Sequence, residues 1–128
     1  MKTDRSGSQS VQAFLEAMQG RDLVRARSFL APGFEMTFPG KVRMKTLEEL
    51  VAWGATRYQK VGKTYERFDE MQQREITIVY CFGSLRGIWL DGRPFEGIRF
   101  IDRFEIQAGL FIRQDVWNDL AETVSRSP

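Results

Sequence analysis

Apolar residues with helical spacing lie near the start of the chain. They occupy positions i, i+3, i+4 and i+7 of one stretch, namely Val11, Phe14, Leu15 and Met18. This spacing places all four on one side of a helix, and it predicts an amphipathic helix that packs against a core. Ser8 or Ser10 is a suitable N-cap, and Gly20 ends the helix. The polar residues 1–9 are expected to form a flexible N-terminus.

Two more helices and a short strand are predicted before the long apolar runs begin. Asp22 caps a second, short helix, which Pro32-Gly33 ends. Residues 34–38 form a short strand. The segment Thr46-Leu47-Glu48-Glu49 matches the S/T-x-x-E capping box and starts a third helix, which Gly62 ends.

The C-terminal half predicts four long strands, over residues 64–72, 75–90, 94–106 and 110–120, followed by a tail over 121–128. Gly83 and Gly87 lie inside one of these strands, where glycines indicate bulges or bends. We therefore expect an α+β fold in which three N-terminal helices pack on the concave face of a strongly curved, mostly antiparallel β-sheet. Residues 10–120 would form one cone-shaped domain with one pocket.

One acid interrupts the apolar face of the predicted strand 94–106. Alternation gives this face the residues Ile98, Phe100, Asp102, Phe104 and Ile106. A buried carboxyl is costly unless it is paired, hydrogen-bonded or protonated. Asp102 is therefore either a pocket acid that donates a hydrogen bond or moves a proton, or a structural acid paired with a neighbouring Arg or Tyr.

Composition restricts the chemistry. The 128 residues are 42% hydrophobic and 28% charged, as in a soluble globular domain, and the net charge of +2 forms no basic stripe. We expect no nucleic-acid partner and no membrane span. A single cysteine, Cys81, and the lack of a signal-peptide pattern predict a cytoplasmic protein. The absence of histidine excludes Ser-His and Cys-His catalysis and the usual zinc ligand sets, so we expect no metal and no cofactor.

Three segments together resemble the nuclear transport factor 2-like superfamily, a cystatin-like cone that includes SnoaL-like polyketide cyclases and ketosteroid isomerase. They are residues 11–18 followed by Arg21-Asp22-Leu23, the aromatic-rich residues 34–39, and Ile101-Asp102-Arg103-Phe104-Glu105-Ile106 before Gly109. The resemblance implies a pocket for a small apolar or carbonyl-containing ligand and a homodimer through the sheet face. It also implies a possible cofactor-free isomerase, cyclase or dehydratase.

The resemblance to ketosteroid isomerase places three catalytic positions in this chain. The oxyanion-donating tyrosine falls at Phe14, the general-base aspartate at Phe38, and the protonated aspartate at Asp102. Phenylalanine neither donates nor accepts a proton, so this mechanism of steroid isomerisation is not expected. A non-catalytic ligand-binding domain and a dimeric interaction domain are the alternatives.

The last strand has two possible registers. In comparison with the epoxide hydrolases of the superfamily, counting from Gly109 without a gap turns Val116 inward, with Gln114 and Asn118 beside it. A one-residue bulge turns Asp115 inward instead, because a slip of one residue exchanges the faces; otherwise Asp115 is a surface acid paired with Arg113. We take Asp102 and Asp115 as candidate catalytic residues. The candidate substrate-binding residues are Phe14, Phe38, Trp53, Tyr80, Val116 and Asn118.

Overall fold

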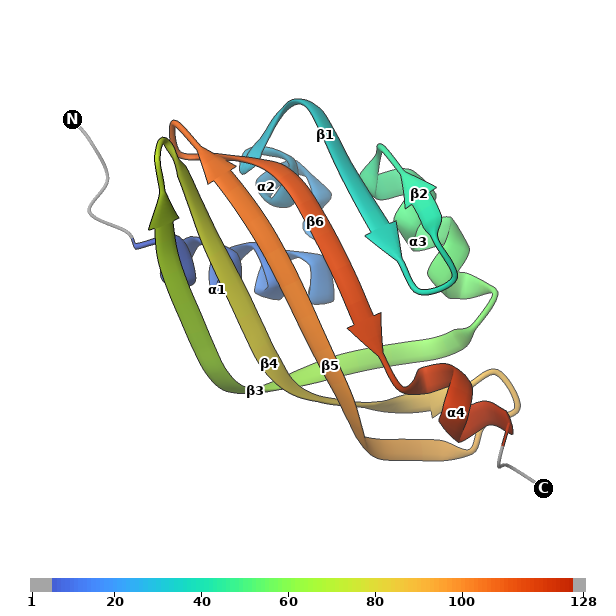
Figure 1. The fold of residues 1–128 in the computed structure, drawn as a ribbon. Helices are drawn as coiled ribbons and strands as arrows, with labels where there is room; N and C mark the ends of the chain where they lie inside the picture. The colour runs from blue at the N-terminus through green and yellow to red at the C-terminus, as the bar shows by residue number, and fades with distance from the viewer. Residues whose placement is uncertain (1–5, 126–128) are drawn as a thin grey trace.

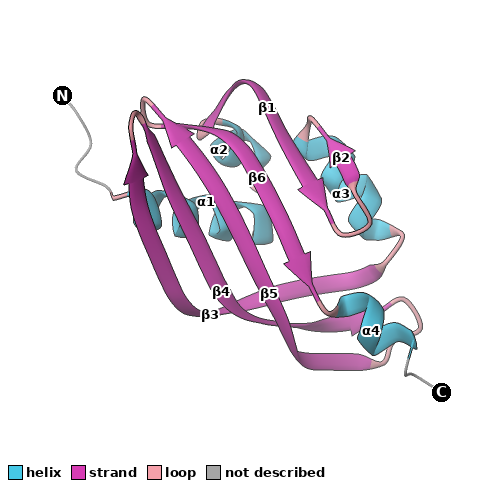
Figure 2. Ribbon diagram, in the orientation of Figure 1, coloured by secondary structure: helices cyan, strands magenta, loops and turns pink. Residues whose placement is uncertain are grey.

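The computed structural model describes residues 6–125, which form one curved sheet with helices against it (Figure 1). The strand order is β2-β1-β6-β5-β4-β3, and all neighbours are antiparallel except the parallel pair β1 and β6. The strands are β1 (Leu30–Phe38), β2 (Val42–Met44), β3 (Tyr58–Gln73), β4 (Ile76–Trp89), β5 (Pro94–Gln107) and β6 (Leu110–Asn118). The helices are α1 (Gly7–Gln19), α2 (Leu23–Arg27), α3 (Leu47–Ala55) and α4 (Leu120–Ser125), shown in cyan in Figure 2. The predicted α+β fold is confirmed.

Helix α1 begins earlier than the sequence predicted. Its N-cap is Ser6, whose hydroxyl accepts a hydrogen bond from the Gln9 backbone N–H at 3.1 Å, while the Gln9 side chain accepts one from the Ser6 N–H at 2.8 Å. This capping box replaces the caps expected at Ser8 or Ser10. Residues 7–9 therefore belong to the helix and not to a flexible N-terminus. Residues 1–5 lie outside the described range.

Other element boundaries also differ from the prediction. Strand β1 starts at Leu30 and continues through Pro32-Gly33, which was expected only to end a helix. Helix α3 keeps its predicted Thr46 cap but ends at Ala55, and Gly62 lies inside β3. Strand β2 was not predicted, and α4 replaces the end of the last strand and part of the tail, of which residues 126–128 are not described. Pairing with neighbouring strands overrides the local preference of glycine to break an element.

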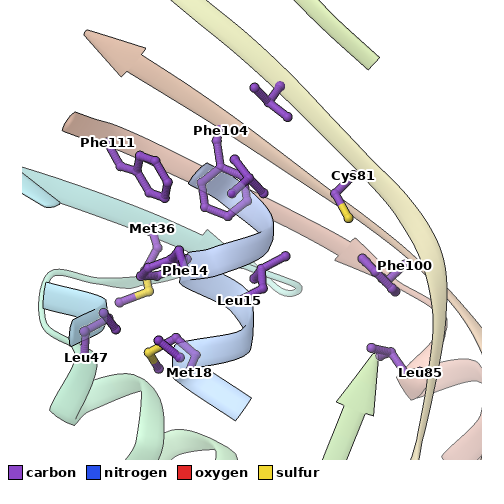
Figure 3. Close-up of a cluster of buried hydrophobic side chains, with 14 of the residues drawn as sticks. Phe14, Leu15, Met18, Met36, Leu47, Cys81, Leu85, Phe100, Phe104 and Phe111 are labelled. Carbon is purple, nitrogen blue, oxygen red and sulfur yellow. The ribbon is translucent and has the colours of Figure 1, made fainter. Parts of the chain in front are cut away.

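Helix α1 packs on the concave face of the sheet through aromatic contacts. The Phe14 ring lies edge-on to Phe104 and Phe111, with ring centroids 5.8 and 5.3 Å apart (Figure 3). The predicted alternation of β5 is present, and its buried face consists of Phe95, Ile98, Phe100, Asp102, Phe104 and Ile106. The core thus lies between the concave face of the sheet and α1. The side chains that alternate with the buried ones lie on the convex face.

Close strand contacts accompany the curvature of the sheet. A Cβ atom at Gly83 would lie 2.0 Å from the Thr64 carbonyl oxygen of β3, so only glycine fits there. The pairing of β4 with β5 also shifts between Leu85 and Gly87. The two glycines therefore mark a close approach and an irregular pairing, as their positions inside a strand indicated.

Candidate functional site

Asp102 lies in the middle of the sheet, on the concave face. It pairs with Cys81 of β4 on one side and Val116 of β6 on the other, and its exposed fraction is 0%. Burial raises the pKa of the Cys81 thiol to about 12, and the Asp102 charge adds to the effect, so this cysteine is a buried apolar side chain and not a nucleophile. The structure thus places the Asp102 carboxyl in an apolar environment, as the alternation of its strand predicted.

Lys63 of β3 is the charge partner of Asp102. Its Nζ lies 3.2 Å from Asp102 Oδ2 and 4.5 Å from the centre of the Phe100 ring. The contact is an ion pair without the alignment of a hydrogen bond, since neither Asp102 oxygen has a hydrogen-bond partner. Burial raises the pKa of Asp102 above its ordinary value of 3.8, and the Lys63 ammonium opposes this shift.

Two pockets that share four wall residues lie next to this pair, and together they are called the two lobes of the cavity. The first lobe measures about 90 Å³, and its wall includes Phe14, Leu15, Met18, Leu50, Val51 and Gln114. The second measures about 40 Å³, and its wall includes Trp53, Leu85, Val116, Asn118 and Leu120. Both lobes share Phe38, Tyr58, Val61 and Lys63. The site is thus an apolar hollow with one ammonium common to both parts.

Asp102 is not on the wall of either lobe. Its side chain is fully buried behind Lys63, whose own side chain is 23% exposed. Gln114 lies on the wall of the first lobe and is 3% exposed, and its Oε1 has no hydrogen-bond partner. A ligand in the cavity would therefore meet Lys63 and Gln114 directly, and Asp102 only through Lys63.

Solved structures of known proteins share this architecture over nearly the whole chain. An NTF2-like protein of unknown function from Burkholderia pseudomallei is 21% identical, over 92% of this chain and 94% of its own, with a TM-score of 0.74. TerC, co-crystallised with polyporic acid, is 16% identical over 92% of this chain and 95% of its own, with a TM-score of 0.73. This chain has the nuclear transport factor 2-like fold. A putative SnoaL-like polyketide cyclase from Jannaschia sp. CCS1 shares it at 18% identity, over 99% of this chain and all of its own, with a TM-score of 0.66.

These similarities establish the NTF2-like fold and no activity. No protein-family model and no curated protein sequence matches the chain. Within residues 6–125, no group of three or more Cys, Asp and Glu residues is arranged to hold a metal ion. None of the described helices has the length and apolar character needed to cross a membrane.

The candidate residues divide between the two faces of this NTF2-like sheet. Those on the cavity wall are Phe14, Phe38, Trp53, Val116 and Asn118. Tyr80 and Asp115 lie on the convex face, which corrects the expectation that they reach the pocket. Both residues pair with Arg103 of β5. The Arg103 guanidinium donates a hydrogen bond to the Tyr80 hydroxyl at 3.2 Å, and one of its nitrogens lies 3.8 Å from Asp115 Oδ2.

The register of β6 decides the position of Asp115. Val116 pairs with Asp102, and Gln114 pairs with Phe104, so these two side chains face the core. The pairing shifts by one residue between the Ile106–Phe111 and Glu105–Arg113 pairs, so the last strand does contain a one-residue bulge. The bulge turns Val116 inward and Asp115 outward, which corrects the expectation that a bulge would turn Asp115 inward. Asp115 accepts a hydrogen bond from Arg113 at 3.0 Å, as a surface acid would.

Sequence reasoning did not find Lys63. Gly62 was expected to end a helix, so the residue after it was not assigned to a face of any strand. The available signal was the alternation Val61-Lys63-Tyr65, which continues the concave face of β3 because these residues pair with Gly87, Leu85 and Gly83. Lys63 is the same kind of exception as Asp102, a charged residue in an apolar series.

Replacing Asp115 with asparagine should leave ligand binding in the cavity unchanged within about twofold, because its carboxyl lies on the opposite face. The free energy of unfolding should fall by at most about 1 kcal/mol, which is the usual contribution of a partly exposed ion pair. Calorimetric titration and urea unfolding of the Asp115→Asn variant measure the two quantities. A tenfold loss of binding would place Asp115 back in the site.

Proposed function

We propose that this protein binds a small, largely apolar molecule in the two-lobed cavity, with the Lys63 ammonium as its main polar contact. The observation that carries the proposal is the Lys63–Asp102 pair, because Lys63 contacts both lobes while Asp102 holds its Nζ at 3.2 Å from behind. In an apolar wall such a donor interacts strongly with a ligand oxygen, since little water competes. An engineered cavity of roughly 150 Å³ binds benzene, so these lobes suit a ligand of about one ring.

Catalysis in this cavity would run through Lys63. An ammonium aimed at a carbonyl oxygen would stabilise the negative charge that develops there when the α-proton leaves during enolisation. Since none of the described residues lining either lobe is a carboxylate, water bound in the cavity would take this proton. Isomerisation, aldol-type cyclisation and dehydration all pass through such charge, and none of them needs a cofactor. Asp102 would position Lys63 and balance its charge, and Gln114 Oε1 would accept a hydrogen bond from a ligand hydroxyl. Asp102 would then not exchange a proton with the ligand itself, which was the catalytic role expected for it from the sequence.

The structural relatives support a small-molecule role. TerC was co-crystallised with polyporic acid, and another relative is a putative SnoaL-like polyketide cyclase. These proteins share the fold at identities of 16% and 18%, at which one fold can host different reactions. They support the binding of a small molecule inside the cone, and the chemistry of that molecule follows from the residues of this chain.

A non-catalytic binding protein is the second candidate. It is favoured by the position of Asp102, which reaches neither lobe, and by Phe14 and Phe38, which provide wall and no proton. A compound that raises the melting temperature and is recovered unchanged after prolonged incubation would support this candidate. Conversion of that compound, lost in a Lys63 variant, would support catalysis.

Filling the first lobe should abolish binding. The Val51→Phe variant places a ring in a space of about 90 Å³, and a ligand present at 100 times its Kd should no longer add the expected ~2.7 kcal/mol to stability. A thermal-shift screen of small carbonyl compounds measures this effect. Val24→Phe is the matched control, because Val24 is 79% exposed on α2 and lines neither lobe. Unchanged binding by Val51→Phe would contradict the proposal.

A further inference from the structure

All charged side chains on the wall of the cavity are positive. Arg21 lies on the first lobe, Arg57 on the second, and Lys63 on both. No acid is among the lining residues of either lobe, all of which belong to the described part of the chain. Asp102 is buried behind Lys63 and faces neither lobe.

The two arginines keep their charge available to the cavity. The Arg21 guanidinium donates a hydrogen bond to the Met18 carbonyl oxygen at 2.6 Å, and the Arg57 guanidinium lies 4.7 Å from the centre of the Trp53 ring. Neither forms an ion pair with a carboxylate within residues 6–125. Both charges lower the pKa of Tyr58, which burial raises, and Tyr58 lines both lobes. The field of both arginines therefore reaches the cavity.

We propose that the ligand is a small anion, with a carboxylate or enolate oxygen at Lys63 and an apolar body of about one ring in the lobes. This inference rests on the proposed function and adds the charge of the ligand to it. Of the three cations on the wall, only Lys63 is balanced by a carboxylate within the described chain, that of Asp102. The hollow therefore keeps a net positive charge that attracts an anion and repels a cation, and low water content strengthens both effects. Charge-assisted hydrogen bonds are about twice as strong as neutral ones, so an anionic oxygen gains most from Lys63.

Gln114 gives the anion a second polar contact. Its Oε1 is buried in the wall of the first lobe without a partner, and a buried acceptor without a partner is costly. A hydroxyl on the ligand would donate to this oxygen while the anionic oxygen contacts Lys63. The ligand class that matches both groups is a hydroxylated, ring-sized carboxylic acid or enol.

The test compares two molecules of one shape and different charge. Benzoate and benzamide are titrated into the full-length protein at pH 7 and followed by calorimetry. Benzoate should bind about tenfold or more tightly than benzamide, because a hydrogen bond to a charged group contributes about 1.5–3 kcal/mol, and 1.4 kcal/mol is tenfold. Benzamide affinity equal to or above that of benzoate would overturn the inference.

Two variants assign the preference to the cavity. Lys63→Met/Asp102→Asn removes one positive and one negative charge, so the net charge of the protein is kept. It should lower benzoate affinity about tenfold and benzamide affinity by a smaller factor, because the benzamide oxygen carries no charge. Arg57→Gln, on the wall of the second lobe, should lower benzoate affinity by about two- to fivefold. Arg25→Gln on α2, which lines neither lobe, is the control and should change neither. Benzoate affinity that is equal in wild type and both variants would overturn the inference.

The outcomes separate the two proposals. If both compounds bind equally and Val51→Phe abolishes both, the cavity is the ligand site and only the anion preference is wrong. If neither compound binds the wild-type protein, the proposed function fails together with the inference.

Discussion

Replacing Lys63 with methionine should lower the free energy of unfolding by about 3–5 kcal/mol at pH 7, because removal of one partner of a buried ion pair leaves the other charge uncompensated. Asp102 has no hydrogen-bond partner and is fully buried, so nothing else among the described residues stabilises its carboxylate. Urea unfolding followed by tryptophan fluorescence measures the change. Lys60→Met is the matched control, since Lys60 is an exposed lysine of the same strand and should change stability by less than about 0.5 kcal/mol.

The loss should depend on pH in a defined direction. In the folded protein, burial raises the pKa of Asp102 above its ordinary value of 3.8, and removal of Lys63 takes away the charge that opposes this shift. Between 3.8 and the folded pKa, the folded state then binds more protons than the unfolded state, so stability falls as pH rises through this window. The deficit of Lys63→Met relative to wild type should therefore shrink as pH is lowered toward 4. A deficit that is constant from pH 4 to pH 7 would show that Asp102 is not its cause.

A second substitution should restore most of the loss. In Lys63→Met/Asp102→Asn the buried carboxylate is gone, and a neutral amide costs less to bury than an unpaired charge. We expect the double variant to recover more than half of the stability lost by Lys63→Met at pH 7. A double variant less stable than the single one would mean that Asp102 stabilises the fold without Lys63.

Replacing Gly83 with alanine should cost about 3 kcal/mol or more, because a Cβ there would lie 2.0 Å from the Thr64 carbonyl oxygen and 2.9 Å from the Phe100 ring. The backbone oxygen cannot move without opening the β3–β4 pairing, which carries Lys63. Thermal and urea unfolding measure the loss.

Gly20→Ala is the matched control for this prediction. The nearest atom to a Cβ at Gly20 would be 3.6 Å away and its φ is −83°, so alanine fits without strain. This variant should be neutral or more stable by up to about 1 kcal/mol. Equal losses in the two variants would contradict the steric reason given for Gly83.

Much of the fold and one half of the charge pair were predictable from periodicity. The alternation of β5 identified Asp102 as an acid on an apolar face, since strict alternation in a long strand assigns every side chain to a face. The capping box at Thr46 and the spacing around Phe14 identified two helices in the same way. These signals are local, so they do not depend on how distant strands pair.

The remaining parts depend on contacts between distant segments. Alternation shows that Tyr80 and Asp115 each share a face with their second neighbours, but it does not show which face lies toward α1. Gly62 is compatible with a helix end and with a strand, and only its pairing with Arg86 decides, which is why Lys63 was missed. The homodimer through the sheet face stays a prediction.

The carbon-13 resonance of the Lys63 side chain, observed by NMR during a titration with benzoate, reports directly on the proposed contact. It can be assigned in lysine-labelled protein by its absence from Lys63→Met/Asp102→Asn. We predict a saturable shift of the Lys63 Cε signal, with the Kd measured by calorimetry, while the signals of the exposed Lys41 and Lys45 stay unchanged. Saturation of binding with an unmoved Lys63 signal would place the ligand elsewhere and contradict the role given to this cavity.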